Sequence, residues 1–241
     1  METYFRTRAI GAKKRTRTRG LLIDSAIDVF SDRGVANARI NEITTLAGLA
    51  NGTFYNHFSD KEELASHTAG AIAIEIATRV DNAMVDIENA VMRIVVASVR
   101  FLTITIENPK WGVVLVDSFY LIPTLRTAGV RYLLSDIERG VQQGHFAVTL
   151  DEFLLDQIGA LTVASLRRQL ATGLDAQLLD RTCEHVLRLL GLTPAKAQLA
   201  IGKAKPLLDI PLPDNMTNVG GIDQPRSKVR YLKEKGRRHD E

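Results

Sequence analysis

One stretch of the chain, LAGLANGTFYNHFSDKEEL at positions 46–64, restricts the possible folds more than any other. Gly48 separates two short helical patterns, and glycine adopts the backbone angles of a tight corner without steric penalty. The second pattern, residues 51–57, places Phe54 on one side and polar side chains on the other. Two short helices joined at such a corner predict a helix-turn-helix, in which the second helix enters the major groove of DNA.

Apolar residues recur at helical spacing through most of the chain. Leu22, Ala26 and Phe30 mark one face of a first helix that closes at Gly34, and a second helix runs from Ile40 to the corner. No strand-type alternation with hairpin turns and no internal repeat interrupts this pattern. The sequence therefore predicts an all-α fold, with further helices at 88–107, 110–121, 124–143, 151–172 and 175–190.

Positive charge is concentrated near the two ends of the chain. The formal net charge is only +3, but residues 1–20 hold seven Lys/Arg and one acidic residue, and the last 48 residues carry +4. Basic segments suit a polyanionic partner, because bound Lys and Arg side chains release the counterions condensed on phosphates. We expect residues 1–17 to form a flexible arm whose Arg15 and Arg17 enter the minor groove of DNA. Basic ends that only aid solubility are the alternative.

The outward side of the predicted recognition helix carries groups that suit DNA. Asn pairs with adenine, Thr contacts a phosphate or a thymine methyl group, and a Tyr hydroxyl reaches a phosphate. The first turn of the following helix offers a lysine beside free backbone amides, where a phosphate also binds well. Phe54 and Phe58 are expected in the core. The expected DNA contacts are Asn51, Gly52, Thr53, Tyr55, Asn56, His57 and Lys61.

These residues carry a resemblance to a known family. The pattern A-I-D-V-F-S-D-R-G…I-N-E-I…A-G-L-A-N-G-T-F-Y-N-H-F-S-D-K-E-E-L, above all G-T-F-Y-x-H-F-x-x-K-x-x-L, resembles the DNA-binding domain of TetR/AcrR-family bacterial transcriptional regulators over residues 18–66. The resemblance implies an Ω-shaped homodimer whose C-terminal helices bind a small effector. It also implies that Arg39 and Asn41, at the start of the second helix, flank the DNA.

The expected starts of three helices follow from capping patterns. An S-x-x-E sequence beginning at Ser59 has the spacing of a capping box for the fourth helix. The family often has Ser or Thr where this chain has Ala38 and Ala50. Asn37 and Asn51 are therefore candidate caps for the second and third helices.

Composition divides the chain into four parts. Residues 1–17 form the arm, 18–66 the helix-turn-helix DNA-binding domain, and 67–193 a larger helical domain for effector binding and dimerisation. Residues 194–241 contain clustered Pro and Gly followed by a highly charged end. Such a composition predicts a disordered basic tail.

The larger helical domain lacks a comparably specific motif. Segments 91–106 and 111–116 have few polar positions and suit the lining of a cavity for an apolar effector, although a packed core without a cavity is the alternative. The apolar faces of 153–171 and 176–190 suit a dimer interface across a two-fold axis, or internal packing in a monomer. The candidate pocket residues are Phe101, Trp111, Phe119, Tyr120, Tyr132 and His145.

Catalytic and membrane functions are not expected. The chain lacks a P-loop, a G-x-S-x-G motif, a dinucleotide-binding fingerprint and H-E-x-x-H. Its single cysteine, Cys183, excludes a disulfide framework and a cysteine-built zinc site, and its spacing from His185 does not suit a nucleophile and base. We expect no cofactor, no metal ion and no membrane span, and a cytoplasmic, nucleoid-associated location.

The leading hypothesis is a homodimeric repressor that a small apolar effector releases from a near-palindromic double-stranded DNA operator. Two alternatives differ from it in class. An architectural DNA-binding protein would bind DNA through its basic arms and respond to no ligand. A ligand-binding protein with a non-functional helix-turn-helix would bind the effector but not DNA.

Overall fold

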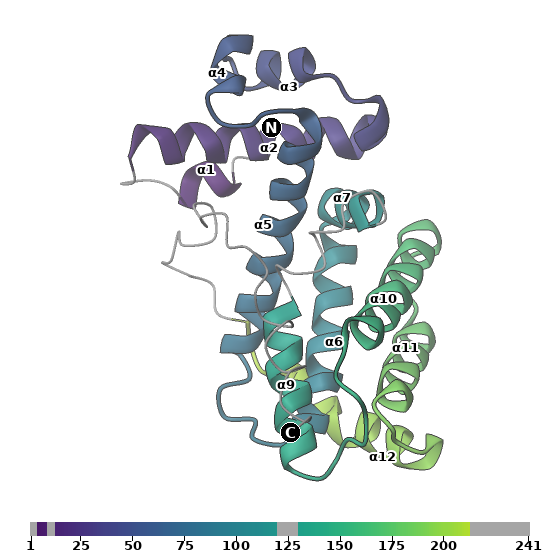
Figure 1. The fold of residues 1–241 in the computed structure, drawn as a ribbon. Helices are drawn as coiled ribbons and strands as arrows, with labels where there is room; N and C mark the ends of the chain where they lie inside the picture. Colours follow the sequence, from purple (N-terminus) through teal and green to yellow (C-terminus); the bar gives the residue numbers. More distant parts are fainter. Residues whose placement is uncertain (1–3, 9–12, 120–129, 213–241) are drawn as a thin grey trace, which may run out of the picture.

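The computed structural model describes residues 4–8, 13–119 and 130–212, and every regular element within these ranges is helical. The all-α prediction is confirmed: a helix-turn-helix domain precedes a larger helical domain (Figure 1). The elements are α1 (Tyr4–Arg8), α2 (Lys14–Asn37), α3 (Ile40–Leu46), α4 (Asn51–Tyr55), α5 (Lys61–Asn82), α6 (Ala90–Glu107), α7 (Pro109–Phe119), α9 (Val130–Gln142), α10 (Glu152–Thr172), α11 (Ala176–Leu189), α12 (Pro194–Ala204) and the 3-10 helix η1 (Lys205–Asp209).

Two helices organise the arrangement of the others. α5 starts beside α4, packs against α2, and then runs into the larger domain, where α6 and α9 lie against it (Figure 1). α6 is the central helix of the larger domain, because it contacts α5, α7, α9, α10, α11 and α12. α7 lies between the two domains, in contact with both α2 and α5. The recognition helix is therefore connected to the larger domain through α5 and through the α2–α7 contact.

The helix-turn-helix domain has a hydrophobic core of its own. Leu22 and Phe30 of α2, Ile43 of α3, Phe54 of α4 and Leu64 of α5 are each fully buried. Burying a side chain of this size contributes roughly 1.5–3 kcal/mol. Helices as short as α3 and α4 are not stable alone, so they depend on this shared core. As expected, the helical backbone of α2 breaks at Gly34, where φ is 75°.

The N-terminal segment differs from the flexible arm that the sequence predicted. Residues 4–8 form α1, and α2 already begins at Lys14. Phe5 is buried, and its backbone N–H donates to Asp24 Oδ1 at 2.8 Å, while the N–H of Arg6 donates to Asp24 Oδ2 at 2.9 Å. α1 is held in place because its Phe5 side chain is buried and because the Asp24 carboxylate of α2 accepts hydrogen bonds from the backbone amides of Phe5 and Arg6.

The expected helix caps are not the ones used. α5 begins after Asp60 rather than Ser59, and the Asp60 side chain accepts from the N–H of Glu63 at 2.6 Å. Arg39 and Ala50 precede α3 and α4, so neither Asn37 nor Asn51 is a cap. The start of α3 is instead closed by Glu42, whose Oε2 accepts from the N–H of Arg39 at 3.0 Å.

The predicted disordered tail is also partly wrong. Residues 194–209 form α12 and η1, and α12 buries Ala197, Ala200, Ile201 and Ala204 against the larger domain. This spacing of i, i+3, i+4 and i+7 is a helical stripe, but its small alanine side chains give a weak signal in the sequence. Residues 213–241 lie outside the described ranges.

A buried ion pair attaches α9 to the rest of the larger domain. The Arg93 guanidinium of α6 donates to Asp136 of α9, and it also pairs with Asp81 of α5 at 2.5 Å. Its Nη1 donates to the carbonyl oxygen of Met84 at 2.7 Å. Arg93 and Asp136 are only 5% and 3% exposed, so each charge depends on its partner for compensation.

We predict that Asp136→Ala lowers the free energy of unfolding by about 3 kcal/mol, because it leaves the Arg93 charge buried with one partner fewer. Urea denaturation followed by circular dichroism measures this change. Glu138→Ala, an exposed carboxylate on the same helix, is the control and should change stability by less than about 0.5 kcal/mol. Equal effects of the two substitutions would contradict the role assigned to the ion pair.

Asp24 predicts a pH dependence of stability. Burial raises its pKa from 3.8 to about 6, against the lowering effect of the Arg6 and Phe5 amides. Between about pH 4 and pH 6, the folded protein therefore holds a proton that the unfolded chain has released. Protonated Asp24 therefore stabilises the folded state fully below about pH 4. As the pH rises through 6, the free energy of unfolding falls by on the order of 1–3 kcal/mol. Asp24→Asn should remove this component from unfolding measured across pH 4–7, and an identical pH profile in both proteins would refute the assignment.

Candidate DNA-binding surface

The recognition helix α4 is held by two aromatic side chains on its inner side. Phe54 and Phe58 are 0% and 2% exposed, and their ring centroids lie 5.9 Å apart. Gly48, with φ 65°, makes the corner between α3 and α4. Thr44 Oγ1 of α3 donates to Asn51 Oδ1 at 2.5 Å, which connects the start of α4 to the preceding helix. The inner side of α4 is thus fixed, and its opposite side faces outward.

The outer side of α4 carries most of the predicted DNA contacts. The Tyr55 side chain is 60% exposed although its ring packs edge-to-face on Phe54, with centroids 5.2 Å apart. Thr53 and His57 are half-buried at the border of this surface. We call the exposed group the α4 outer face, and it consists of Asn51, Gly52, Tyr55 and Asn56.

The Lys61 side chain, which the sequence predicted to contact a phosphate, is held against the protein by two hydrogen bonds. Its Nζ donates to the carbonyl oxygens of Ala36 at 2.8 Å and Ala38 at 3.1 Å. The ammonium group has three N–H donors, so these two bonds leave one direction for a phosphate. Lys61 therefore joins the start of α5 to the α2–α3 connection, a structural role that the sequence did not indicate.

The two arginines expected in the minor groove do not lie on the same side of α2. Arg15 and Arg19 are four residues apart and share a face. Arg19 Nη1 donates to the carbonyl oxygen of His57 at 3.1 Å, so this face lies beside the end of the recognition helix. Arg17 is exposed but is turned about 200° from Arg15 around the helix. It shares its face with Asp24, which contacts α1, so only Arg15 remains a candidate for DNA.

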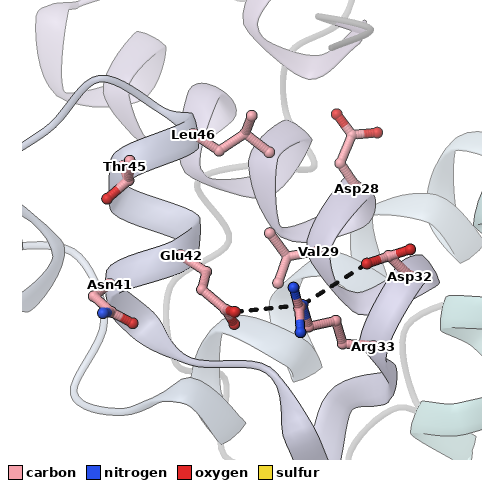
Figure 2. A pocket seen from close by; sticks show the side chains of 8 residues that line it. All are labelled: Asp28, Val29, Asp32, Arg33, Asn41, Glu42, Thr45 and Leu46. Atoms are coloured by element: carbon pink, nitrogen blue, oxygen red, sulfur yellow. Dashed lines mark ion pairs between the residues drawn. The ribbon is translucent and has the colours of Figure 1, made fainter.

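The start of α3 borders an acidic groove between α2 and α3 (Figure 2). Arg33 of α2 pairs with Glu42 of α3 across this groove at 3.3 Å and with its neighbour Asp32 on α2 at 3.7 Å. Asn41 is exposed and lines this groove, whereas Arg39 is exposed just before the start of α3. Because the acidic side chains of the groove repel phosphate, Asn41 on its lining is a weaker candidate for a DNA contact than Arg39.

The candidate effector residues do not form one site. Trp111 follows the C-terminal end of α6, whereas His145 is exposed, and its Nε2 lies 3.2 Å from Asn89 Nδ2, just before the start of α6. α6 has 18 residues and is about 27 Å long, so Trp111 and His145 cannot line one small-molecule pocket. Trp111 instead packs on Tyr4, with ring centroids 5.0 Å apart.

The other pocket candidates lie nearer the middle of the larger domain. Phe101 of α6 and Phe119 of α7 are half-buried, and Phe119 lies directly against Gly159 of α10, where an added Cβ would approach its ring to 2.9 Å. The Tyr132 hydroxyl is 3.0 Å from Thr78 Oγ1, between α9 and α5. Tyr120 lies outside the described residues. Two of the candidates, Phe101 and Phe119, thus come from α6 and from α7, which packs against α6.

The described residues include no group of three or more His, Cys, Asp or Glu side chains that could hold a metal ion. Cys183 is buried, and burial raises the pKa of its thiol to about 12, so it is not a thiolate at neutral pH. Within the part of the chain that the structure describes, no helix is long and apolar enough to cross a membrane.

An exposed short helix after a glycine corner is the arrangement of a helix-turn-helix DNA-binding domain. The sequence profile described as "Bacterial regulatory proteins, tetR family" matches residues 22–68, which cover most of α2 and all of α3 and α4. The likeness to this family is thus established for residues 22–68, the helix-turn-helix region.

Two curated relatives match in the same region. The HTH-type transcriptional repressor DhaR of Mycobacterium sp. (strain GP1) is 40% identical over 48 residues, and the HTH-type transcriptional regulator AcrR of Shigella flexneri is 41% identical over 49 residues. Each match covers 20% of this chain and only 24% or 23% of the relative. The similarity in sequence is therefore confined to the DNA-binding domain.

Solved structures extend the likeness to the larger domain. RolR in complex with resorcinol superposes with a TM-score of 0.62 at 24% identity, over 84% of this chain and 98% of RolR. FadR from Bacillus subtilis in complex with stearoyl-CoA gives a TM-score of 0.57 at 16% identity, over 71% and 97% of the two chains. At these identities the comparison establishes the fold.

The corner of the helix-turn-helix gives a prediction with a close control. Gly48→Ala should lower the free energy of unfolding by about 1–2 kcal/mol, because φ of 65° places a Cβ against the following carbonyl oxygen. Gly52→Ala should be neutral or slightly stabilising, since Gly52 lies in a helix. Apart from the adjoining backbone, no atom lies within 4 Å of a Cβ added at either glycine, so only the backbone angle separates the two variants. Equal stability of both variants in urea denaturation would show that the corner is unstrained.

Proposed function

We propose that the protein is a homodimeric transcriptional repressor that binds a near-palindromic operator and is released from it by a small apolar effector. The observation that carries this proposal is the α4 outer face: Tyr55 and its polar neighbours point outward, while Phe54 of the helix and Phe58 just after it are buried. The inner edge of the Tyr55 ring packs on Phe54, but 60% of the side chain is exposed, which leaves its hydroxyl available to a phosphate of DNA.

The roles of the proposed DNA contacts differ. Asn56 would read a base edge in the major groove, since Asn bonds adenine in a bidentate manner. Tyr55, Arg15 and Lys61 would contact phosphates, which position the helix without reading sequence. In a two-fold dimer the two recognition helices would enter successive major grooves about 34–36 Å apart.

The outer side of α10 supports the proposed dimer. Phe153 is 68% exposed, and Ala164 is exposed on the same helix. Of the faces that the sequence suggested for an interface, Ile158 and Val186 are instead buried within the monomer. The proposed interface is therefore narrower than expected and consists of the outward side chains of α10 and α11.

An apolar effector would bind in the larger domain, near Phe101 and Phe119. RolR and FadR, which share the fold, were crystallised with resorcinol and stearoyl-CoA. A ligand that separates α6 from α7 would shift α7 against α2 and tilt α5, because both helices contact the DNA-binding domain. Effector and operator would then weaken each other's binding by the same factor, typically ~1–3 kcal/mol.

Fluorescence anisotropy of the full chain on the DNA that flanks its own gene, with shuffled DNA as the reference, tests this function. We expect tighter binding to the native fragment, and Asn56→Ala should reduce that preference by about 1–3 kcal/mol. Tyr55→Phe, the matched variant, should weaken binding to both DNAs equally. Equal, steeply salt-dependent binding of the unmodified protein to both DNAs would favour an architectural role, and no binding at low salt would contradict DNA binding altogether.

A further inference from the structure

The short helix α1 contacts elements of both domains. It lies across the N-terminal half of α2 (Figure 1), where Gly20 is directly beneath the backbone of Phe5. A Cβ added to Gly20 would approach the Phe5 carbonyl group to 3.0 Å. Asp24, one turn further along α2, binds the N–H groups of Phe5 and Arg6. α1 is therefore seated on the DNA-binding domain by close backbone contact and by two hydrogen bonds to a buried carboxylate.

The aromatic side chains of α1 contact the other side of the domain boundary. Tyr4 packs edge-to-face on Trp111 of α7, with ring centroids 5.0 Å apart, and the Phe5 ring stacks on the same indole at 6.1 Å. The Tyr4 hydroxyl donates to Glu75 Oε1 of α5 at 2.5 Å. Phe5 and Trp111 are only 3% and 8% exposed. One short segment thus joins α2, α5 and α7 through buried contacts.

We propose that α1 is an interdomain clamp, which holds the DNA-binding domain in one orientation on the larger domain. The ion pair between Asp28 of α2 and Lys110 of α7, at 2.6 Å, lies in the same interface. Because it is partly exposed, it stabilises the interface less than the buried contacts of α1 do. When α1 detaches from α2, Tyr4 and Phe5 no longer pack on Trp111 beside the α2–α7 contact. The recognition helix then samples more orientations relative to the larger domain, and hence relative to the second recognition helix of the proposed dimer.

The clamp itself does not depend on DNA binding, whereas its effect on operator preference rests on the proposed function. A segment engaged on Trp111 and Asp24 cannot at the same time lie in a DNA groove. For residues 4–8, the clamp therefore replaces the minor-groove role that the sequence suggested for the N-terminal arm.

Gly20→Gln tests the proposal in the full chain. The new side chain enters the space that the Phe5 backbone occupies, while Gln remains a good helix former. Gly202→Gln is the matched control, because Gly202 is also helical and no atom lies within 4 Å of its added Cβ. Phe5→Ala, which removes the buried ring without altering α2, is the second test variant. Trp111 is the only tryptophan of the chain and reports the state of the clamp directly.

Two measurements without DNA decide whether the clamp exists. In Gly20→Gln and in Phe5→Ala, acrylamide should quench Trp111 fluorescence at least about twofold more strongly than in the unmodified protein, and the emission should shift to longer wavelength. Hydrogen exchange should become faster in residues 20–37 and 109–119 but remain unchanged in α11. Gly202→Gln should match the unmodified protein. Unchanged quenching or unchanged exchange in both test variants would overturn the clamp, whatever the result with DNA.

A third measurement tests the consequence for DNA binding. The ratio of affinities for the gene-flanking and shuffled DNA should fall about threefold or more in Gly20→Gln and in Phe5→Ala, with affinity for shuffled DNA unchanged. An unchanged ratio despite increased quenching would overturn the proposed control of orientation. If the unmodified protein binds neither DNA, the proposed function fails, while quenching and exchange still decide the clamp.

Discussion

The burial of Phe54 and Phe58 between α2, α3 and α5 is the interaction on which the DNA-binding domain depends. α4 has five residues and cannot be stable without these two rings. Their burial fixes the rotation of α4, and that rotation places Tyr55 and Asn56 outward. The same packing that stabilises the domain therefore defines the surface that is proposed to contact DNA.

The two domains share helices rather than meeting through a flexible linker. α5 belongs to both, and α7 packs on α2 beside it. α1 adds buried aromatic contacts to this boundary through Trp111. A rigid boundary of this kind suits a regulator, because a change in the larger domain reaches the recognition helix only if the connecting elements do not absorb it.

The sequence predicted the elements with the strongest local signals. The helical backbone breaks at Gly34 and turns at Gly48 as expected, because glycine adopts positive φ without steric cost wherever it stands in a sequence. The missed elements have weak local signals. α1 has five residues and is held by Asp24 from a distant part of the chain, and α12 buries mainly alanines. The role of Lys61 was missed for the same reason, because its two carbonyl partners lie more than 20 residues away.

The sequence by itself determined the all-α fold, the helix-turn-helix and the likeness of residues 22–68 to one family, because these follow from helical periodicity, a glycine corner and a dense local motif. Only the tertiary structure decided which candidates share a site. It separated Trp111 from His145 by the length of α6, and it placed Arg15 and Arg17 on different sides of α2. Local patterns reflect interactions within a few residues, whereas a site is assembled from side chains whose distances depend on how helices pack.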